Sequence, residues 1–465
     1  MIKTTSEREN IMNSGRTRLR AAARAIAAKC AVLAIAIIVA PSTSVAQVRM
    51  TVPTQSEPIA LQGATIHTVT NGVIENGTIV FENGVITAVG ANVTVPSGAR
   101  VIDVSGKHIY PGMIDAYATV GISEIGAVDM SNDVREVGDF NPNIRAELGV
   151  NAESRHIGTS RSAGVLTTLT TPAGGLISGM SSAMALEGWT WEEMSLEGAA
   201  ALNVNWPNPN PRRRGFGGFG GFGNQDEQPT YAERVEQLKN FFAEARAYRD
   251  AVEAGEEVRT DSRYEAMIPA LNGDIPVVVA ANGIAQINDA ITWATAEGLR
   301  LVIRGGNDAI HAADRLVAEQ IPVILTSTMS APGRAHEGYD EAYRRAAALY
   351  EAGVKFAISG GADALGTDRL GYEAGVAVAF GLPEEEALKA VTINAAEFMG
   401  LDDRIGSLEP GKQATLLITT GTPIDMTSDI EQAYIQGREL DMNDIQKHFF
   451  EKYMIKIQQR LRIIM

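Results

Sequence analysis

The sequence predicts an α/β protein in which a closed barrel of eight strands, ringed by helices, carries a small β-sandwich domain. After Tyr110, short apolar runs alternate with longer stretches of helical periodicity, which is typical of a parallel sheet covered by helices. This pattern lasts for roughly 290 residues, which suits a TIM-like (β/α)8 barrel of ~250 residues plus insertions. Short strands and turns stand on both sides of this region and predict the second domain.

Six apolar runs are candidates for barrel strands, and the last four are the clearest: residues 113–117, 165–170, 275–280, 300–304, 322–327 and 354–359. Segments rich in Ala, Glu and Leu join the last four and would cover the outer face of the sheet. An open doubly wound sheet is the alternative, but no GxGxxG motif follows an early strand. We therefore place the barrel at residues 110–404.

The β-sandwich domain is predicted from residues 59–109 together with 405–440. The first segment alternates apolar and polar residues between turns, and its Asn83-Gly84 pair favours a type I′ hairpin because both residues tolerate positive φ. Strand-and-turn style returns at residues 405–438, so the two parts are predicted to form one domain. Residues 441–465 predict a terminal helix with four apolar residues on one face: Phe449, Phe450, Tyr453 and Ile457.

The first 46 residues have the pattern of a secretory signal. Seven Lys or Arg residues precede the apolar run 30–40, and Ser44-Val-Ala46 has the small-x-small form of a cleavage site. An uncleaved anchor is the alternative, but this run is well short of the ~20 residues needed to span a bilayer. We therefore expect an exported protein, periplasmic or extracellular, without a stable membrane span once residues 1–46 are removed.

Charge and cysteine content narrow the function classes. Removing residues 1–46 takes away seven positive and two negative charges, so the formal net charge moves from -16 to about -21. Such a chain is not expected to bind nucleic acid. The single cysteine, Cys30, leaves with the signal, which excludes a disulfide or a cysteine nucleophile within the mature chain. The Gly/Phe-rich insertion 207–228 is predicted to be a disordered loop.

The segment PGMIDAYAT, residues 111–119, resembles the start of the barrel in the amidohydrolase superfamily, where the pattern is Pro-Gly-hydrophobic-Ile-Asp-x-His-x-His. LPEEEAL (382–388), TINAA (392–396) and GSLEPGK (406–412) are similar to the imidazolonepropionase-like branch. The resemblance covers residues 59–438 with its motifs in family order. It implies a metal-dependent hydrolase of carbon-nitrogen bonds such as cyclic amides, with a divalent ion such as Zn²⁺.

The metal-ligand positions implied by the resemblance carry other residues here. Side chains at i and i+2 of a strand share a face, so His-x-His can chelate one ion, but Tyr117 and Thr119 stand at those positions. The fifth-strand histidine corresponds to Ala280, and the sixth strand supplies Arg304, which cannot coordinate a cation. Gly361 occupies the position of the eighth-strand aspartate. No lysine lies in residues 195–206, the expected fourth strand.

The remaining candidates for a catalytic group are Asp115, Asp363, Asp368 and His336, each of which could serve as a base near the barrel. The alternative for each of these four residues is a structural role, as a side chain that caps a loop or is solvated at the surface. The other histidines, at 67, 108, 156, 311 and 448, form no ligand pair at i, i+2 or i, i+4 spacing. The stretch GMSSA, residues 179–183, lacks the second glycine of a nucleophile elbow and is predicted to be loop and turn.

Two functions stay open from sequence. The first is an exported amidohydrolase acting on a small-molecule substrate, through unanticipated metal ligands or through a carboxylate base. The second is an inactive relative, a pseudoenzyme, that keeps the barrel as a binding or assembly surface within a homo- or hetero-oligomer. Fold alone does not decide between them.

Overall fold

The computed structural model describes residues 52–209, 229–335, 337–361 and 363–464. By its contacts the chain divides into two units, Met1–Met50 and Thr51–Met465, and every described residue belongs to the second. The expected signal segment, most of the Gly/Phe-rich insertion and the candidate His336 lie outside the described residues.

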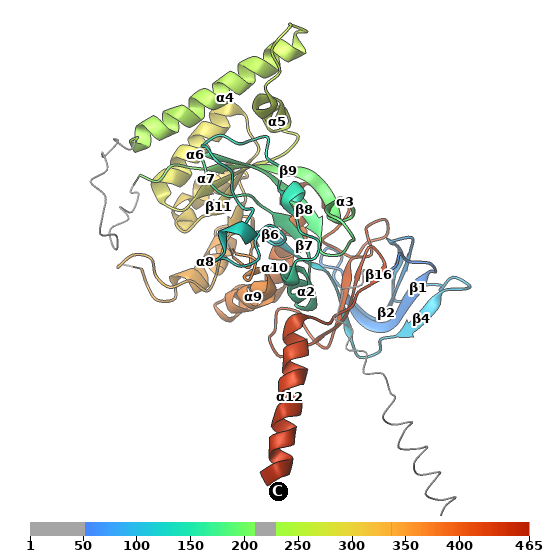
Figure 1. Ribbon diagram of the computed structural model, residues 1–465. Helices are drawn as coiled ribbons and strands as arrows, with labels where there is room; N and C mark the ends of the chain where they lie inside the picture. Colours follow the sequence, from blue (N-terminus) through green and yellow to red (C-terminus); the bar gives the residue numbers. More distant parts are fainter. Residues whose placement is uncertain (1–51, 210–228, 336, 362, 465) are drawn as a thin grey trace, which may run out of the picture. The chain divides into compact units, whose positions relative to one another are not determined.

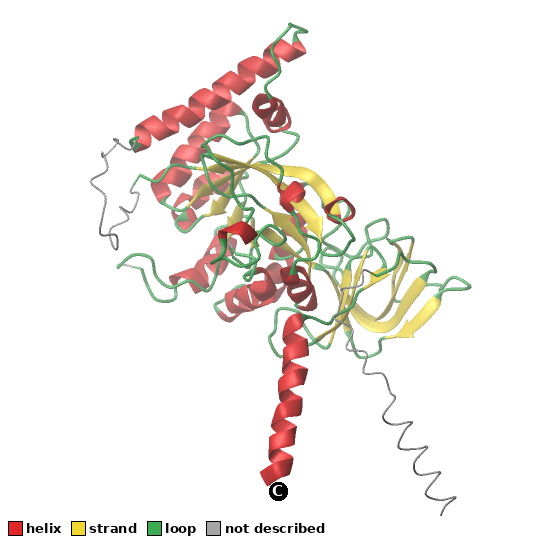
Figure 2. Cartoon of the chain, viewed as in Figure 1, coloured by secondary structure: helices red, strands yellow, loops and turns green. Residues whose placement is uncertain are grey.

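The larger sheet is a nearly closed barrel of eight strands, which confirms the predicted α/β barrel (Figures 1 and 2). Its strands follow one another around the sheet in chain order from β6 to β13. They are β6 (Met113–Ala118), β7 (Val165–Thr170), β8 (Ile177–Ala185), β9 (Ser195–Asn205), β10 (Val277–Ala281), β11 (Leu301–Gly305), β12 (Val323–Leu325) and β13 (Phe356–Ile358). Each of the six apolar runs identified from sequence lies on one of these strands, and residues 165–170 match β7 at both ends.

Strand β8 departs from the predicted pattern. It runs antiparallel to both neighbours, β7 and β9, so this part of the barrel is a meander and not a strand-helix-strand unit. The prediction of loop and turn for residues 179–183 is therefore wrong, because these residues lie in the middle of β8. All nine residues of β8 are buried, and six of them are Gly, Ala or Ser, whose small side chains let the strand pack on both faces.

The gap between the first and last barrel strands, β6 and β13, is closed by side chains and not by a strand ladder. The Ser359 hydroxyl donates to the Tyr117 carbonyl at 2.7 Å. The Asp115 carboxylate accepts from the backbone N–H of Tyr117 at 3.1 Å and of Gly360 at 3.4 Å. Asp115 therefore ties the two edges of the sheet together.

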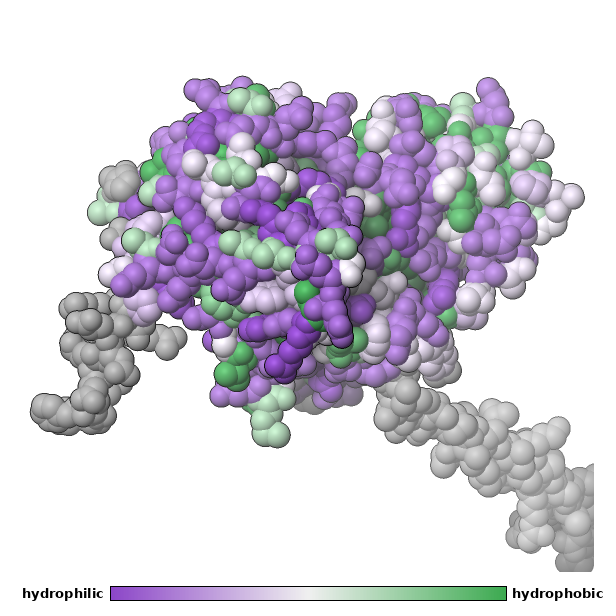
Figure 3. All heavy atoms as spheres, turned by 90° about the horizontal axis from the view of Figure 1, so that it is seen from above, coloured by the Kyte–Doolittle hydropathy of each residue, from purple (hydrophilic) through white to green (hydrophobic). Residues whose placement is uncertain are grey.

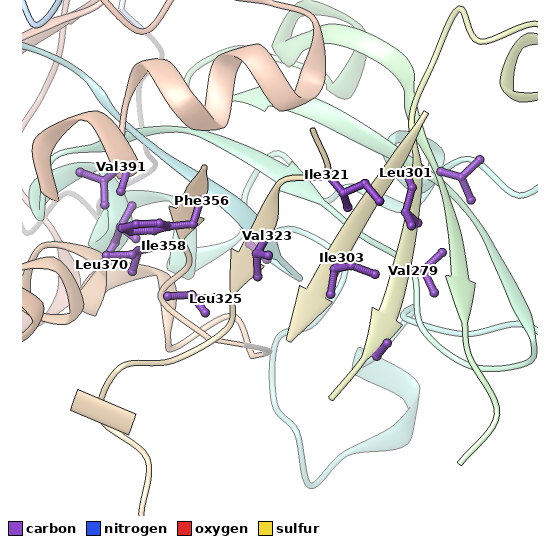
Figure 4. Packing of buried hydrophobic residues seen from close by; sticks show 14 of the residues in the cluster. Val279, Leu301, Ile303, Ile321, Val323, Leu325, Phe356, Ile358, Leu370 and Val391 are labelled. Atoms are coloured by element: carbon purple, nitrogen blue, oxygen red, sulfur yellow. The ribbon is translucent and has the colours of Figure 1, made fainter. Parts of the chain in front are cut away.

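Side chains alternate along the barrel strands between the interior and the helical layer, as strand geometry requires. Val278, Val302 and Ile324 belong to the core inside the barrel. Val279, Ile303 and their neighbours on β12 and β13 face the helices, and Figure 4 shows them in a continuous row across four strands. The helices are α2 (Arg155–Ser162), α3 (Trp191–Met194), α4 (Tyr231–Glu253), α5 (Ser262–Leu271), α6 (Ile284–Glu297), α7 (Ala313–Ala318), α8 (Glu341–Glu351), α9 (Leu370–Ala379), α10 (Glu384–Ala390) and α11 (Ile393–Met399), with short 3-10 turns η1 (Asp129–Ser131), η2 (Ala146–Gly149), η3 (Ala309–Ala312) and η4 (Thr367–Arg369).

A second sheet of eight strands is built from both sides of the barrel segment. Its strands are β1 (Ile59–His67), β2 (Val73–Glu82), β3 (Val85–Gly90), β4 (Arg100–Asp103), β5 (His108–Pro111), β14 (Leu416–Thr419), β15 (Ile430–Ile435) and β16 (Arg438–Glu439). Strand β5 pairs antiparallel with β14, which joins the early strands to the late ones. Asn83 and Gly84 have φ of 51° and 80° at the β2–β3 turn, as a type I′ hairpin requires. All eight strands form one sheet around its own apolar cluster.

The C-terminal helix α12 (Ile445–Ile464) presents apolar side chains to solvent, including Phe449, Phe450, Tyr453 and Ile457. Within the described part of the chain, no helix is both long and apolar enough to be a membrane span. Hydrophilic side chains dominate the face seen in Figure 3, where apolar ones occur in small groups.

Candidate functional site at the barrel mouth

The barrel mouth is defined here by the carboxyl ends of the parallel barrel strands, where barrels of this type place their functional residues. Sheet register fixes one layer of this mouth. Ala280 on β10 pairs with Asn205 on β9 and with Arg304 on β11, so these three residues lie side by side. Tyr117, near the end of β6, completes the layer by contacting Arg304.

Arg304 is the central residue of this layer. Its guanidinium carbon lies 4.1 Å from the centre of the Tyr117 ring, which is the geometry of a cation–π contact. Its Nη2 donates to Asn205 Oδ1 at 3.1 Å. The side chain is only 6% exposed, so these contacts are made away from bulk water.

The charge of Arg304 has no anionic partner among the described residues. No Asp or Glu of the described segments forms an ion pair with it, and its buried Nη1 has no hydrogen-bond acceptor there. Burial lowers the pKa of Arg304 below its ordinary value, because removing a guanidinium from water penalises the charged form. The mouth therefore contains a desolvated cation that is only partly satisfied.

Asn205 is held in place by three hydrogen bonds. Its amide nitrogen donates to the carbonyls of Gly174 and Gly175, at 3.2 and 3.1 Å, and to the Ser178 hydroxyl at 3.1 Å. Gly174 and Gly175 have φ of 92° and 63°, a conformation that suits glycine and turns both carbonyls toward Asn205. With its nitrogen fixed in this way, Asn205 presents its oxygen to Arg304.

A second neutral network lies on the adjoining strands. Asn203 on β9 donates to the Ser181 hydroxyl at 2.5 Å, and Ser181 in turn lies 2.9 Å from the Thr171 hydroxyl. All three side chains are buried. This side of the barrel therefore offers amides and hydroxyls, which bind polar neutral or anionic groups and are weak ligands for a divalent ion.

Asp115, one of the candidate bases, is fully buried in the seam between β6 and β13. Burial raises its pKa to about 6, and hydrogen bonds from Ser359, Tyr117 and Gly360 offset part of that rise. Such a value suits proton transfer near neutral pH. However, a carboxylate with no exposed surface and with both oxygens bonded to the chain does not reach a water or a substrate in this conformation.

The other candidate bases lie on the segment after β13. Asp363 is exposed. Asp368, in η4, is half-buried, and burial raises its pKa, with the charges of Arg369 and His156 acting in the opposite direction. Neither carboxylate forms a hydrogen bond or an ion pair with Arg304 or Tyr117, so among the described residues the sequence candidates do not come together in one site.

A divalent metal does not fit the barrel mouth. Among the described residues, no group of three His, Asp, Glu or Cys side chains is placed to hold an ion. Tyr117 is covered by a guanidinium, which would repel a metal, and Ala280 has no donor atom. Gly361 has φ of 123°, which an L-residue such as aspartate rarely adopts, so an aspartate at this position would be strained.

Two cavities lie away from this layer. The larger, about 380 Å³, is lined by Lys355 and Phe356 at the start of β13 and therefore lies at the opposite end of the barrel. The smaller, about 210 Å³, lies between the segment after β6 and Pro172, which closely follows β7. Arg135 and Arg145 line the smaller cavity together with Asp133 and Glu136. Only the smaller one adjoins the carboxyl ends of barrel strands.

The small sheet contains a contact that local spacing does not show. His67 on β1 lies 3.1 Å from His108 on β5, measured between Nε2 and Nδ1, and stacks on Tyr110 with ring centres 4.1 Å apart. Burial and the neighbouring His108 lower the pKa of His67 to about 4. The pairing depends on the parallel register of β1 and β5, which joins residues far apart in sequence.

Comparison with known proteins agrees with the fold and with the sequence motifs. The family model described as "Amidohydrolase family" matches residues 279–447. An imidazolonepropionase from Symbiobacterium thermophilum is 25% identical over 408 residues, covering 74% of this chain and 84% of that protein. The amidohydrolase tasK of Hapsidospora irregularis is 22% identical over 402 residues, covering 78% of this chain and 39% of that protein.

A solved structure resembles most of the described chain. The crystal structure of an amidohydrolase from Thermotoga maritima superposes with a TM-score of 0.74 at 27% identity, covering 82% of this chain and 99% of the other.

Proposed function

Because this chain belongs to the amidohydrolase superfamily, we propose that it acts on a small molecule with a non-peptide carbon-nitrogen bond of the cyclic-amide type, as a hydrolase that works without the family's divalent metal. The bond class is supported by relatives named imidazolonepropionase and amidohydrolase. The observation that carries the metal-free part is the Arg304–Tyr117 contact, which puts a cation where the family places a metal ligand.

The substrate would bind at the barrel mouth. The side-chain carbonyl oxygen of Asn203 and the Arg304 Nη1 group can hold the polar edge of an amide, since neither has a hydrogen-bond partner among the described residues. Buried, prearranged donors of this kind stabilise a developing negative charge better than water does. Water activation would fall to a carboxylate, and Asp368, half-buried with a raised pKa, is better suited than the exposed Asp363.

A second candidate function is a non-catalytic binding or assembly protein. One observation favours it: Asp115, a carboxylate in the middle of β6 whose pKa of about 6 would suit proton transfer, is sealed in the barrel seam at 0% exposure. In that case the mouth would retain ligand binding and lose hydrolysis. Assembly with a copy of itself or with another protein belongs to this proposal, and the exposed apolar side chains of α12 support it.

Export is a further part of the proposal. It is supported by the basic, apolar and small-residue order of residues 1–46. The test is N-terminal sequencing of the protein secreted by its native cells. A mature N-terminus at Gln47 is the expected result, and retention of residues 1–46 in the cell would contradict it.

The enzymatic part is tested with the mature protein after dialysis against a chelator. Metal content is measured by mass spectrometry, and the release of ring-opened product from a panel of cyclic amides is followed. Turnover by metal-free protein, abolished in Asp368→Asn and retained in Asp363→Asn, is the expected result. Activity that returns only with added zinc would overturn the metal-free account, and no turnover with retained ligand binding would favour the non-catalytic candidate.

A further inference from the structure

The C-terminal helix α12 meets the rest of the protein at its first turn and is exposed beyond it. Asp444 caps the helix by accepting from the backbone N–H groups of Gln446 and Lys447, at 2.7 and 2.9 Å. The other oxygen of its carboxylate accepts from the Ser162 hydroxyl of α2. Every residue of 446–460 is exposed. The match to the amidohydrolase family model ends at residue 447, so almost all of this exposed part lies outside the matched region.

Five large apolar side chains cover one face of α12. They have exposed fractions from 38% to 67% and are Phe449, Phe450, Tyr453, Met454 and Ile457. Successive helical residues are about 100° apart, so Phe449 and Met454 lie about 140° from each other, with the other three between them. A helix with neither face packed is of marginal stability in water, because most helical stability in proteins comes from burying such a face. This face is therefore expected to be covered by a partner.

Basic residues border the apolar face of α12. Lys456 and Lys447 fall about 20° beyond its two ends. Lys452 lies along the same edge as Lys456, with its Nζ 5.8 Å from the centre of the Phe449 ring and 6.0 Å from that of Tyr453. A lysine in this position can lay its apolar stem along the rings and extend its charge past them.

Charge indicates what kind of partner fits. Residues 445–460 carry four Lys or Arg and one Glu, in a chain whose formal net charge is -16. Within the described segments none of these four cations forms an ion pair, whereas Lys389, for example, pairs with Glu386. Arg460 falls within the apolar face near the end of the helix, where a long side chain can still reach a polar boundary. Unpaired cations around an apolar face are the pattern of a helix that lies in the interface of an anionic membrane.

The geometry points to a lipid surface: we propose that α12 binds a bilayer that contains anionic phospholipids. The helix lies in the plane of the headgroups, with its apolar face toward the acyl chains and its lysines at the level of the phosphates. It lies on the bilayer and not across it, since charges along both edges of the face would be costly at the bilayer centre. This inference goes beyond the proposed function and does not rest on it.

A second copy of α12 fits this face less well. Phe450, Met454 and Ile457 have the a and d spacing of a coiled coil, but such a pairing is typical of roughly three to four heptads or more. The 20 residues of α12 make fewer than three heptads. The apolar face is also wider than a two-residue seam. Two helices packed side by side would bring the lysines at the edges of their faces together, and these like charges would repel.

The experiment measures co-sedimentation of the mature protein with vesicles of phosphatidylcholine alone, or of equal parts phosphatidylcholine and phosphatidylglycerol. Ile457→Ser removes an apolar residue from the lipid-facing side. Ile455→Ser is the matched control, because Ile455 is 56% exposed and Ile457 51%, yet the two lie about 160° apart around the helix. Lys456→Gln tests the charge, with Lys239→Gln on α4 as the control at another exposed lysine.

The wild type should bind the anionic vesicles at least roughly tenfold more tightly than the neutral ones, and added salt should weaken this binding. Ile457→Ser should weaken it roughly tenfold, while Ile455→Ser leaves it nearly unchanged. Lys456→Gln should weaken it roughly fivefold, while Lys239→Gln has little effect. All four variants should keep the Tm of the wild type, since the substituted side chains are at least half-exposed.

Three outcomes would overturn the inference: no binding to anionic vesicles, equal binding to both kinds of vesicle, or equal effects of Ile457→Ser and Ile455→Ser. Light scattering of the protein without lipid tests the competing partner. A dimer that Ile457→Ser dissociates and Ile455→Ser preserves would assign the face to a second copy of the chain.

Discussion

The guanidinium of Arg304 lies 4.1 Å from the ring of Tyr117, although the two residues belong to strands β11 and β6, which are not neighbours in the barrel sheet. Both positions correspond to metal ligands in the resemblance to amidohydrolases. In this chain they contact each other and not a common ion. The two residues therefore depend on each other, since the ring of Tyr117 covers the charge of Arg304.

This contact predicts how a metal site could be rebuilt. Tyr117→His with Thr119→His restores a pair at i and i+2, but the adjacent cation should keep zinc from binding. Adding Ala280→His and Arg304→His removes that charge and supplies two more nitrogen ligands. Isothermal titration calorimetry with zinc should detect binding only in the four-fold variant. Equal zinc affinity in the double variant would contradict the role assigned to Arg304.

The backbone at Gly361 predicts that the eighth-strand aspartate cannot simply be restored. Gly361 has φ of 123°, and a Cβ placed there meets nothing closer than 3.8 Å, so the strain of Gly361→Asp is conformational and not steric. We expect a loss of about 1–3 kcal/mol in the free energy of unfolding, measured by urea denaturation. Gly126→Asp is the control, because Gly126 has neither a positive φ nor a near contact. Equal losses of unfolding free energy in the two variants would rule out backbone strain at Gly361 as the cause.

Asp115 predicts a pH dependence with a definite sign. Its pKa is raised from 3.8 to about 6 in the fold, so between these values the folded state binds the proton more tightly than the unfolded state. Stability should therefore fall as pH rises through this window, by at most about 1.4 kcal/mol for each pH unit. Asp115→Asn should remove that slope in urea titrations at several pH values.

Asp115→Asn should also lower stability below pH 4, because an amide has one acceptor oxygen and cannot serve both the Tyr117 and Gly360 N–H groups. The matched control is Asp103→Asn, since Asp103 is exposed at the end of strand β4. A slope that survives in Asp115→Asn would assign the titration to another group.

His67 predicts a pH dependence of stability with the sign opposite to that of Asp115. Its pKa is lowered from 6.5 to about 4, so the unfolded state binds the proton more tightly, and stability should fall as pH drops from 6.5 toward 4. The two effects oppose each other between about pH 4 and 6. His67→Phe keeps a ring against Tyr110 and removes the titration, so it should expose the Asp115 slope in unfolding measurements. An unchanged profile would show that His67 does not titrate in this range.

The barrel could be predicted from sequence because its strands are apolar and separated by helical segments. Strand β7, with Val165, Leu166 and Leu169, is a clear run of this kind. Strand β8 was missed because its sequence, ISGMSSAMA, is dominated by small residues that also favour turns. It is a strand because β7 and β9 supply hydrogen-bonding partners on both sides, and that tertiary effect is not encoded in its own composition.

The sequence predicted which residues occupy the candidate site, but it did not predict which of their side chains contact each other. Family motifs place Tyr117, Ala280, Arg304 and Gly361 around one point, and the structure adds that Arg304 covers Tyr117 and donates to Asn205. Asn205 carried no sequence signal, because an asparagine at a strand end is common. The burial of Asp115 was equally hidden, since it depends on how β6 meets β13.

The pairing of Ile109 with Ile418 has a consequence for synthesis. A ribosome completes the early strands of the small sheet long before it makes β14, so strand β5 leaves the exit tunnel with an unpaired edge. An unpaired edge strand can join with other chains. If the chain crosses a membrane unfolded, strand β5 does not form an edge until the whole sequence is available. The two halves of the sheet can then pair within one molecule.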